Sequence, residues 1–410
     1  MTALEQQLPL TRRMLLGGLG CACCAGVVGT AEARIRPANM KPLVGAGHRP
    51  TEKDEQGLWQ QYQRVEEEIA GSNLLIKDPA LAAYVGGLAA KVGGPASGQL
   101  RVYLARIPEF NAFIAPTGFM VVFSGLLLRM RDEAQLSGVI AHEAGHFLRR
   151  HQIRMWRDLK RKTAALTVLA MGAGVGGAAT GVYAGDLVRL AHLGAILSLF
   201  SYSRELEAEA DAMGLKQIAA AGYDPAAMPE TWQQLIEETQ VSADMRRKRR
   251  KRGYSLLATH PAPEERMVDL RASAREVTSA RTTERARARY LQAIGAHRKG
   301  WLDDQVKLND PGASLYLIRN LSKDGWNGLL RYYEGEVWRL RGQKGDNALA
   351  GQSYAAAVTL PDAPPEAWRA HGQQLIRAGR REEGRAALQR YLALAPNAPD
   401  AAMVRHSLSQ

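Results

Sequence analysis

The spacing of apolar residues along the chain predicts a mostly helical protein with one short, strand-rich segment. Between residues 59 and 92 apolar positions recur at helical intervals, and Asp78-Pro79 interrupts them with two residue types that suit a new helix start. Residues 100–105 instead alternate between apolar and polar, and residues 110–123 have strand character on both sides of a Pro-Thr-Gly turn. The pattern therefore predicts a small sheet set among helices.

Helical spacing returns after the strands. Residues 131–151 predict one continuous helix, and residues 187–222 predict another stretch of helix in which Ser203 is a suitable N-cap. Between them, residues 163–185 carry no charge and are rich in glycine. That length could span a bilayer, but the glycine content disfavours a single stable helix in water.

The C-terminal hundred residues contain a repeat. Pro361-Asp362-Ala363-Pro364 recurs 35 residues later as Pro396-Asn397-Ala398-Pro399, each time after an Ala-, Leu- and Tyr-rich helical segment. The period is close to the roughly 34 residues of a tetratricopeptide unit, although the full repeat pattern is incomplete. We expect helical-hairpin repeats here; the alternative is a non-repeating helical bundle.

The first 33 residues have the features of an export signal. Arg12-Arg13 precedes an apolar run that continues to Val28, and Ala31-Glu32-Ala33 matches a signal-peptidase site. The paired arginines favour export by the twin-arginine route. The alternatives are an uncleaved membrane anchor or a lipid anchor, although Cys21 lacks a good lipobox. All three cysteines lie in this segment, so the mature chain must bind any metal through histidine and carboxylate.

Composition narrows the choice of partners only a little. The chain has 410 residues, 46% of them hydrophobic and 23% charged, as in ordinary globular proteins. The net charge of +13 suggests acidic partners, and residues 246–252 form an unbroken basic run. Because the chain has an export signal and no nucleic-acid-binding motif, we do not expect nucleic acid to be the partner.

A metal-binding motif lies in the helix predicted over residues 131–151. His142 and His146 are four residues apart, so both imidazoles leave one helix face and can bind one zinc ion. Glu143 can act as general base on a zinc-activated water. The alternative is a helix with two exposed histidines and an incidental glutamate. The apolar residues that flank the motif argue against it, because they would bury the helix. The metzincin continuation is excluded, because Arg149 and Gln152 stand where it requires Gly and His.

A zinc peptidase needs a third protein ligand, and an acidic helix offers several. Glu205, Glu207 and Glu209 all follow Ser203 within one predicted helix. Glu207 and Asp211 share one face, so one could bind the metal while the other holds a histidine. Glu205 and Glu209 share a different face. Spacing alone leaves the choice open.

Several segments across most of the mature chain match one family of peptidases. These are Asp78-Pro79, Asn111-Ala112-Phe113, Pro116-Thr117-Gly118, Ser124-Gly125-Leu126-Leu127, Glu133, His142-Glu143 with His146, Ser203-Arg204 with Glu207 and Ala210-Asp211, and Thr259-His260-Pro261 with Arg266. With them the chain resembles gluzincin peptidases of the HtpX and Oma type, and most closely the exported, BepA-like subgroup with C-terminal tetratricopeptide repeats. The resemblance implies that Glu207 is the third zinc ligand and that Asp211 supports the site.

The same resemblance implies an α+β, mostly helical fold. We expect a zincin-like protease domain with a small edge sheet at residues 34–280, a basic helical linker at 281–310, and tetratricopeptide-like repeats at 311–410. The strand segment at residues 111–123 could pair with an extended substrate.

His260 and Arg266 are further candidates for catalytic roles. His260 could occupy the fourth zinc position and keep the enzyme latent; alternatively, His260 or Arg266 could donate a hydrogen bond to the oxyanion formed during attack. A histidine that only caps a neighbouring helix is the third option.

The expected function is a metalloendopeptidase, with one zinc ion per chain, that cleaves unfolded or misassembled envelope proteins in the periplasm. The repeats would recruit these substrates or the outer-membrane assembly machinery. The alternative is a largely latent protease that acts as a chaperone or scaffold. Residues 163–185 and the basic run could contact an anionic membrane; otherwise they form a buried hairpin and a disordered loop.

Overall fold

The computed structural model describes residues 35–170, 202–246, 260, 264–279 and 281–409. The predicted export signal lies outside these residues, as do the glycine-rich segment from residue 171 onward and the basic run from residue 247 onward. Among the helices that the structure describes, none combines the length and hydropathy needed to cross a lipid bilayer.

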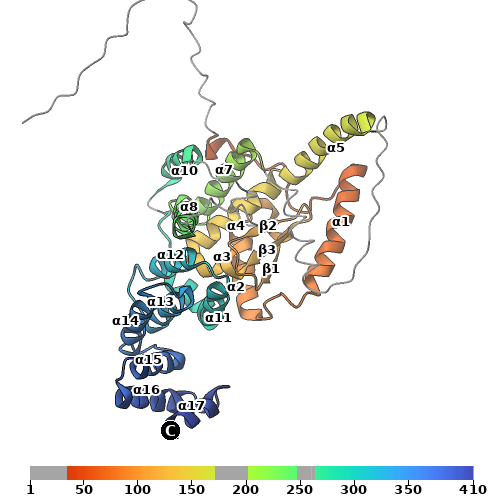
Figure 1. Ribbon diagram of the computed structural model, residues 1–410. Coiled ribbons are helices and arrows are strands. Elements are labelled where there is room, and N and C mark those ends of the chain that lie inside the picture. Colours follow the sequence, from red (N-terminus) through yellow and green to blue (C-terminus); the bar gives the residue numbers. More distant parts are fainter. Residues whose placement is uncertain (1–34, 171–201, 247–259, 261–263, 280, 410) are drawn as a thin grey trace, which may run out of the picture. The chain divides into compact units, whose positions relative to one another are not determined.

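Helices dominate the described residues, as expected, and the strands of one small sheet lie in the first half of the sequence (Figure 1). The elements up to the acidic helix are η1 (Pro37–Asn39), α1 (Lys53–Ala70), α2 (Pro79–Val92), η2 (Gly94–Gln99), β1 (Arg101–Ala105), β2 (Ala112–Ile114), β3 (Phe119–Phe123), α3 (Ser124–Arg129), α4 (Glu133–Leu148), α5 (His151–Ala170) and α7 (Arg204–Ala220). The elements after it are α8 (Ala227–Arg246), α10 (Glu264–Val277), α11 (Arg287–Lys307), α12 (Pro311–Leu321), α13 (Gly328–Arg341), α14 (Asp346–Val358), α15 (Pro365–Arg377), α16 (Arg381–Leu394) and α17 (Ala401–Ser409).

Side-chain caps start several of these helices where the sequence predicts. Asp78 accepts hydrogen bonds from the amides of Ala80 and Leu81 at the start of α2. Ser203 Oγ accepts from the amide of Leu206 and begins α7, which confirms the predicted N-cap. These caps satisfy amide groups that have no partner in the first helical turn, so their positions follow from local chemistry.

The sheet has the strand order β1-β3-β2, with β1 parallel and β2 antiparallel to β3. This confirms the strands predicted at residues 100–105 and 110–123. Between β2 and β3 the chain turns at Gly118, whose φ of 90° favours glycine, and the amide of Gly118 donates to the carbonyl of Ala115. Within the described residues, β2 pairs only with β3 and forms an edge of the sheet.

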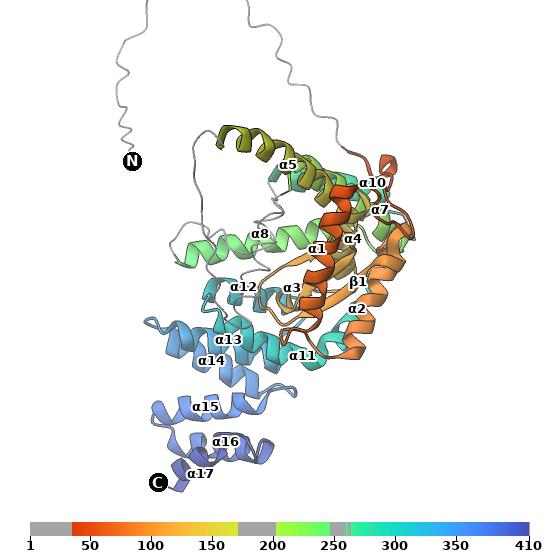
Figure 2. The same ribbon diagram turned by 90° about the vertical axis from the view of Figure 1, so that its right-hand side faces the viewer.

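The two faces of the sheet are covered by different helices (Figure 2). Along β3, the side chains of Phe119, Val121 and Phe123 pack in a cluster with apolar residues of α1. Met120 and Val122 point the other way, into the larger core that includes residues of α2 and α4. Strand alternation thus places α4, which carries the metal-binding motif, against one face of the sheet.

The helix predicted over residues 131–151 is wrong in one respect: it is two helices. α4 ends at Leu148, Arg150 adopts a left-handed backbone with φ 55°, and α5 begins at His151. The apolar pattern continues through this point, so sequence periodicity did not reveal the break. The break is accompanied by tertiary ion pairs, because Arg149 binds Glu209 and Arg150 binds the buried Glu55.

The C-terminal third is helical throughout its described residues. Residues 287–307 of the predicted linker form α11, which buries Tyr290, Ile294, Trp301 and Leu302 in the same hydrophobic cluster as α2 and α4. That cluster continues into α15, so the proposed domain boundaries at residues 280 and 310 stay a prediction.

The repeated Pro-x-Ala-Pro segments lie at equivalent places between helices. The first lies between α14 and α15 and the second between α16 and α17. Successive helices pack on one another, and Gly372 allows close contact between α15 and α16, since a Cβ there would meet the carbonyl oxygen of Gly384 at 2.8 Å. The arrangement suits helical hairpins, and the tetratricopeptide assignment stays a prediction.

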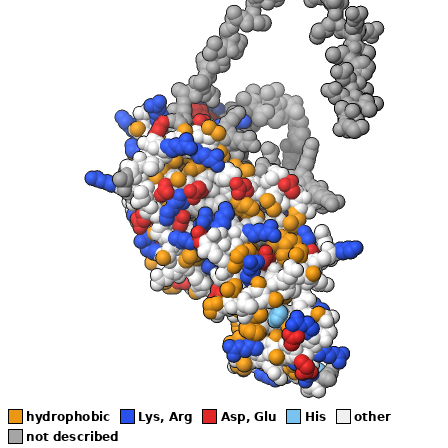
Figure 3. Space-filling model, turned by 90° about the vertical axis from the view of Figure 1, so that its left-hand side faces the viewer, with side chains coloured by type: hydrophobic (Ala, Val, Ile, Leu, Met, Phe, Trp, Pro, Cys, Tyr) orange, Lys and Arg blue, Asp and Glu red, His pale blue; other side chains and the backbone are white. Residues whose placement is uncertain are grey.

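Basic side chains are scattered among acidic and apolar ones over the face shown in Figure 3. Many of the arginines of the described residues are paired with carboxylates, for example Arg285 with Glu230 and Arg287 with Asp324. On this face the excess positive charge is therefore distributed rather than gathered in one patch.

Candidate metal centre and active site

Two helices, α4 and α7, pack closely and bring the motif residues together. Glycines make this approach possible. A Cβ on Gly145 would meet the carbonyl oxygen of Ala210 at 2.8 Å, and a Cβ on Gly214 would meet the amide nitrogen of His142 at 3.1 Å. Both contacts lie at the interface of α4 and α7, so the glycine within the histidine motif allows the two helices to pack closely.

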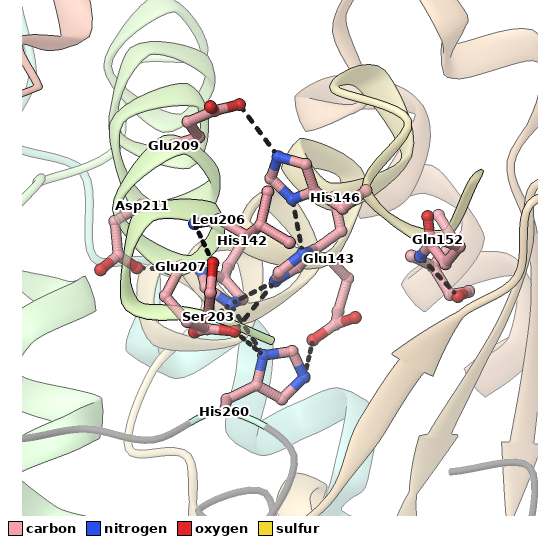
Figure 4. A network of polar contacts seen from close by, with 12 residues as sticks. His142, Glu143, His146, Gln152, Ser203, Leu206, Glu207, Glu209, Asp211 and His260 are labelled. Carbon is pink, nitrogen blue, oxygen red and sulfur yellow. Dashed lines mark hydrogen bonds and ion pairs between the residues drawn. The ribbon is translucent and has the colours of Figure 1, made fainter. Parts of the chain in front are cut away.

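Four buried side chains converge at this interface: His142, His146, Glu207 and His260 (Figure 4). One potential metal-binding atom from each lies within 4.8 Å of all the others. The Nε2 atoms of His142 and His146 are 3.1 Å apart, and each lies 3.5 Å from an oxygen of Glu207. Of the three glutamates that the sequence left open, Glu207 is the one that faces both motif histidines.

The hydrogen bond on the far side of His142 decides which of its nitrogens faces the cluster. Asp211 Oδ1 lies 2.9 Å from Nδ1 of His142. Burial opposes ionisation of Asp211, but the neighbouring Arg266 and His142 outweigh it and hold the pKa of this carboxyl well below its usual range. An ionised carboxylate only accepts, so Nδ1–H of His142 donates to Asp211 and Nε2 is the nitrogen that faces the cluster.

The protonation states of the other two ligand candidates suit a metal. Burial, together with the surrounding imidazoles, lowers the pKa of His146 well below its ordinary value, so the ring is neutral at pH 7. Burial of Glu207 works against its charge, but His260 and Arg266 outweigh burial and lower its pKa. Imidazole nitrogens and an ionised carboxylate that point at one another are the donor set that zinc binds, and the residues therefore fit this ion.

Glu143 lies beside the four converging groups rather than among them. Its Oε1 is buried without a hydrogen bond, and the nearest partner is Nε2 of His260 at 3.4 Å. Burial raises the pKa of Glu143, although it also receives a hydrogen bond from the backbone amide of Ile114 in β2. A buried carboxylate with an unsatisfied oxygen next to a metal-binding cluster is suited to accept a proton.

His260 lies against both glutamates. Its Nδ1 is 2.8 Å from Glu207 Oε1 and 3.3 Å from His142 Nε2, and its Nε2 faces Glu143. Burial favours the neutral ring, but the two carboxylates outweigh it and raise the pKa of His260. This residue therefore contacts the site itself.

Arg266 lies between two carboxylates of α7. Its Nη1 lies 2.7 Å from Glu207 Oε2, its Nε lies 2.7 Å from Asp211 Oδ2, and its guanidinium lies over the ring of Trp232. The side chain is buried and engaged by the two carboxylates. The geometry suits a residue that orients Glu207 and Asp211, and its role as an oxyanion donor stays a prediction.

Sequence reasoning did not single out three aromatic or imidazole side chains of the site. Tyr202 stacks on the ring of His146 at 3.8 Å between ring centroids, Trp232 meets His142 edge-on at 5.6 Å, and His151 Nδ1 lies 2.8 Å from His146 Nδ1. All three are buried. No short-range signal marks them, because Tyr202 and Trp232 are far from the motif in sequence and His151 is five residues from His146.

Comparisons with known proteins agree with this geometry. Residues 76–274 match the sequence profile described as peptidase family M48. The putative beta-barrel assembly-enhancing protease of Vibrio cholerae is 29% identical over 262 residues, which cover 62% of this chain and 51% of that protein. The beta-barrel assembly-enhancing protease of Escherichia coli K12 is 31% identical over 51% of this chain and 42% of that protein. The mitochondrial metalloendopeptidase OMA1 of Arabidopsis thaliana is 34% identical over 139 residues, 33% of this chain and 25% of that protein. The match spans about half the length of the Vibrio cholerae protein and a smaller share of the other two.

Proposed function

With residues 76–274 as a peptidase family M48 domain, we propose that the chain is a zinc-dependent metalloendopeptidase. One observation carries this proposal: His142, His146 and Glu207 direct ligand atoms at one point, and Glu143 lies beside that point with a buried carboxylate oxygen that has no hydrogen bond. His142, His146 and Glu207 would hold the ion.

Zinc bound there would supply a Lewis acid that polarises the scissile carbonyl and lowers the pKa of a water molecule towards about 7. Glu143 would accept the proton of the attacking water and return it to the leaving amine. Asp211 would keep His142 in the tautomer that presents Nε2, and Arg266 would hold Glu207 and Asp211 in place.

The edge strand β2 would position the substrate. In the ladder with β3, Asn111 and Ala115 make backbone hydrogen bonds to Phe123 and Phe119, so the backbone groups of the alternate residues Ala112 and Ile114 point away from β3. The amide of Ile114 reaches Glu143, and its carbonyl accepts from Gln152. An extended peptide that pairs with Ala112 would therefore lie next to the general base.

Latency is the second feature of the proposal. His260 adds a nitrogen to the ligand cluster and faces Glu143, so it would keep substrate from the metal and engage the general base until it moves away. This arrangement favours the capping role of His260 over the oxyanion role. It also gives the alternative function, a chaperone or scaffold with a mostly latent site, a structural basis.

The substrates we propose are unfolded or misassembled envelope proteins. Two relatives are beta-barrel assembly-enhancing proteases by name, which supports an action on proteins of the outer membrane. The C-terminal helices α13 to α17 would recruit substrates or the outer-membrane assembly machinery.

The periplasm is the proposed location, reached by the twin-arginine route. Replacing Arg12 and Arg13 with Lys should leave the precursor in the cytoplasm, whereas continued export would exclude that route. We also propose that residues 163–185 and 246–252 contact anionic lipid; flotation of the mature protein with anionic liposomes at low salt tests this contact, and absence of binding would refute it.

The enzymatic proposal is tested by removing and restoring the metal. The purified protein should contain one zinc ion per chain, lose hydrolysis of casein when a chelator removes the ion, and recover it when zinc is returned. His260→Ala should be assayed in parallel, because a latent wild-type protein would hydrolyse casein slowly. If neither protein cleaves casein with zinc bound, the proposed activity is wrong.

A further inference from the structure

His146 is held from behind by a second histidine. His151 Nδ1 lies 2.8 Å from His146 Nδ1, and His151 Nε2 lies 3.1 Å from Glu209 Oε2. His151 is fully buried and Glu209 is 6% exposed. The three side chains form a line from α7 to the ring of His146, on the opposite side of that ring from the converging Nε2 atoms.

The proton positions along this line follow from Glu209. The same oxygen, Oε2, also receives Nε–H of Arg149 and an N–H of Arg154, both at 2.8 Å. A carboxylate that binds two guanidinium groups is ionised and only accepts, so Nε2 of His151 carries its proton. The contact between the two Nδ1 atoms needs one donor and one acceptor, and with Nε2–H of His151 given to Glu209 it is completed when Nδ1–H of His146 donates to Nδ1 of His151. Nε2 of His146 is therefore the unprotonated nitrogen, and it faces Glu207.

The backbone break after α4 makes this contact possible. In a continuous helix, side chains five residues apart point about 140° away from each other, so His151 could not reach His146. The left-handed conformation of Arg150 ends α4 and redirects the chain, and His151 at the start of α5 comes to lie against His146. The local departure from regular helix thus coincides with a specific side-chain contact.

Helix α7 supplies a carboxylate to each motif histidine. Asp211 binds Nδ1 of His142 directly, whereas Glu209 acts on Nδ1 of His146 through His151. Glu207 precedes both of these carboxylates in sequence and faces both Nε2 atoms. One helix therefore orients both imidazoles and provides the third ligand.

We propose that His151 and Glu209 are positioning residues for the metal centre, which hold His146 in the tautomer and orientation that bind zinc. The inference rests on the proposed function, because it assigns a role relative to the zinc ion proposed above. His151 does not contact the reacting groups, and it would act through His146. Loss of such an outer partner typically weakens metal binding by about 10–100-fold.

The test measures zinc affinity of the purified full chain by competition with a chromophoric chelator, and the visible spectrum of the cobalt-substituted protein. His151→Leu should weaken zinc binding by about 10–100-fold and alter the cobalt spectrum. His151→Asn should recover most of the affinity, since its Oδ1 can take the place of Nδ1 as acceptor. Glu209→Gln should also weaken binding, whereas Glu205→Gln, an exposed glutamate of the same helix, should bind zinc as the wild type does.

The outcomes separate this inference from the proposed function. If the wild-type protein binds zinc and cleaves casein, but His151→Leu binds zinc equally tightly, the inference is wrong and the function stands. Equally weak zinc binding by His151→Asn and His151→Leu would also overturn it. If the Leu variant does not fold, the comparison is between the other two variants, and a lower zinc affinity of His151→Asn than of Glu209→Gln would overturn the inference. If the wild-type protein and His260→Ala both bind zinc without cleaving casein, the function is refuted, while the order of zinc affinities among the variants still decides the inference. A wild-type protein without zinc affinity would refute both.

Discussion

Asp211 Oδ1 lies 2.9 Å from Nδ1 of His142, on the side of the ring opposite to Glu207. We expect Asp211→Asn to weaken zinc binding by about 10–100-fold, because the neutral amide no longer requires a proton on Nδ1 and no longer pairs with Arg266. Chelator competition measures the change. Asp269→Asn, an exposed aspartate in α10, is the matched control and should leave the affinity unchanged.

Glu143→Gln should retain zinc and lose hydrolysis. The amide has nearly the same shape but cannot accept the proton of the attacking water, so turnover should fall by about 10²–10⁴-fold. Zinc content and casein cleavage are measured on one preparation, with Glu205→Gln as the control. Cleavage at the wild-type rate would exclude Glu143 as general base.

His260→Ala should raise basal proteolysis, because removal of the ring frees Glu143 and opens the ligand cluster to substrate. The specific activity is measured on an unstructured substrate after zinc content has been checked. A fall of about 10²–10³-fold would instead indicate an oxyanion donor. Activity within about twofold of the wild type would leave only a structural role.

Glu133 makes the stability of the catalytic helix dependent on pH. Burial disfavours its charge, but hydrogen bonds from Arg289, Tyr223 and Tyr84 outweigh burial and hold its pKa below the ordinary 4.5. Because the pKa is depressed in the folded state, the ionised group stabilises the fold above pH 4.5, and this stabilisation is lost as the pH falls towards the folded pKa.

Glu133→Gln should therefore lower the free energy of unfolding by roughly 1–3 kcal/mol near pH 7, and less in acid. Denaturant unfolding at several pH values measures the difference. Glu68→Gln, an exposed glutamate of α1, is the control. A difference that stays constant from neutral pH into acid would contradict the role given to the charge.

Gly145→Ala should separate α4 from α7. The added Cβ would meet the carbonyl oxygen of Ala210 at 2.8 Å, so the helices must move and the fold should lose about 1–3 kcal/mol. Zinc affinity should fall as well, since Glu207 lies on the displaced helix. Gly87→Ala in α2 has open space around its Cβ and should stabilise the protein slightly. Equal stability of the two variants would refute the packing argument.

Local sequence was sufficient for the features that depend on near neighbours. The four-residue spacing of His142 and His146 places both on one helix face in any α-helix, and Ser203 caps α7 with its own hydroxyl. The strand at residues 101–105 followed from alternation, and the strand at residues 119–123 followed from strand character beside the Pro-Thr-Gly turn. These signals arise within a few residues, so the fold class and two ligand candidates could be predicted without the tertiary structure.

Contacts between distant segments decided the rest. The sequence placed Glu205, Glu207 and Glu209 on one helix but not relative to α4; only the packing of α7 brings Glu207 to the motif histidines and Glu209 to His151. The break at Arg150 and the contact of His151 with His146 have no periodic signal, and the ion pairs beside them join this segment to Glu209 and Glu55 of other helices. Spacing along a chain determines which side chains share a face, whereas the close packing of faces from different elements determines what each side chain meets.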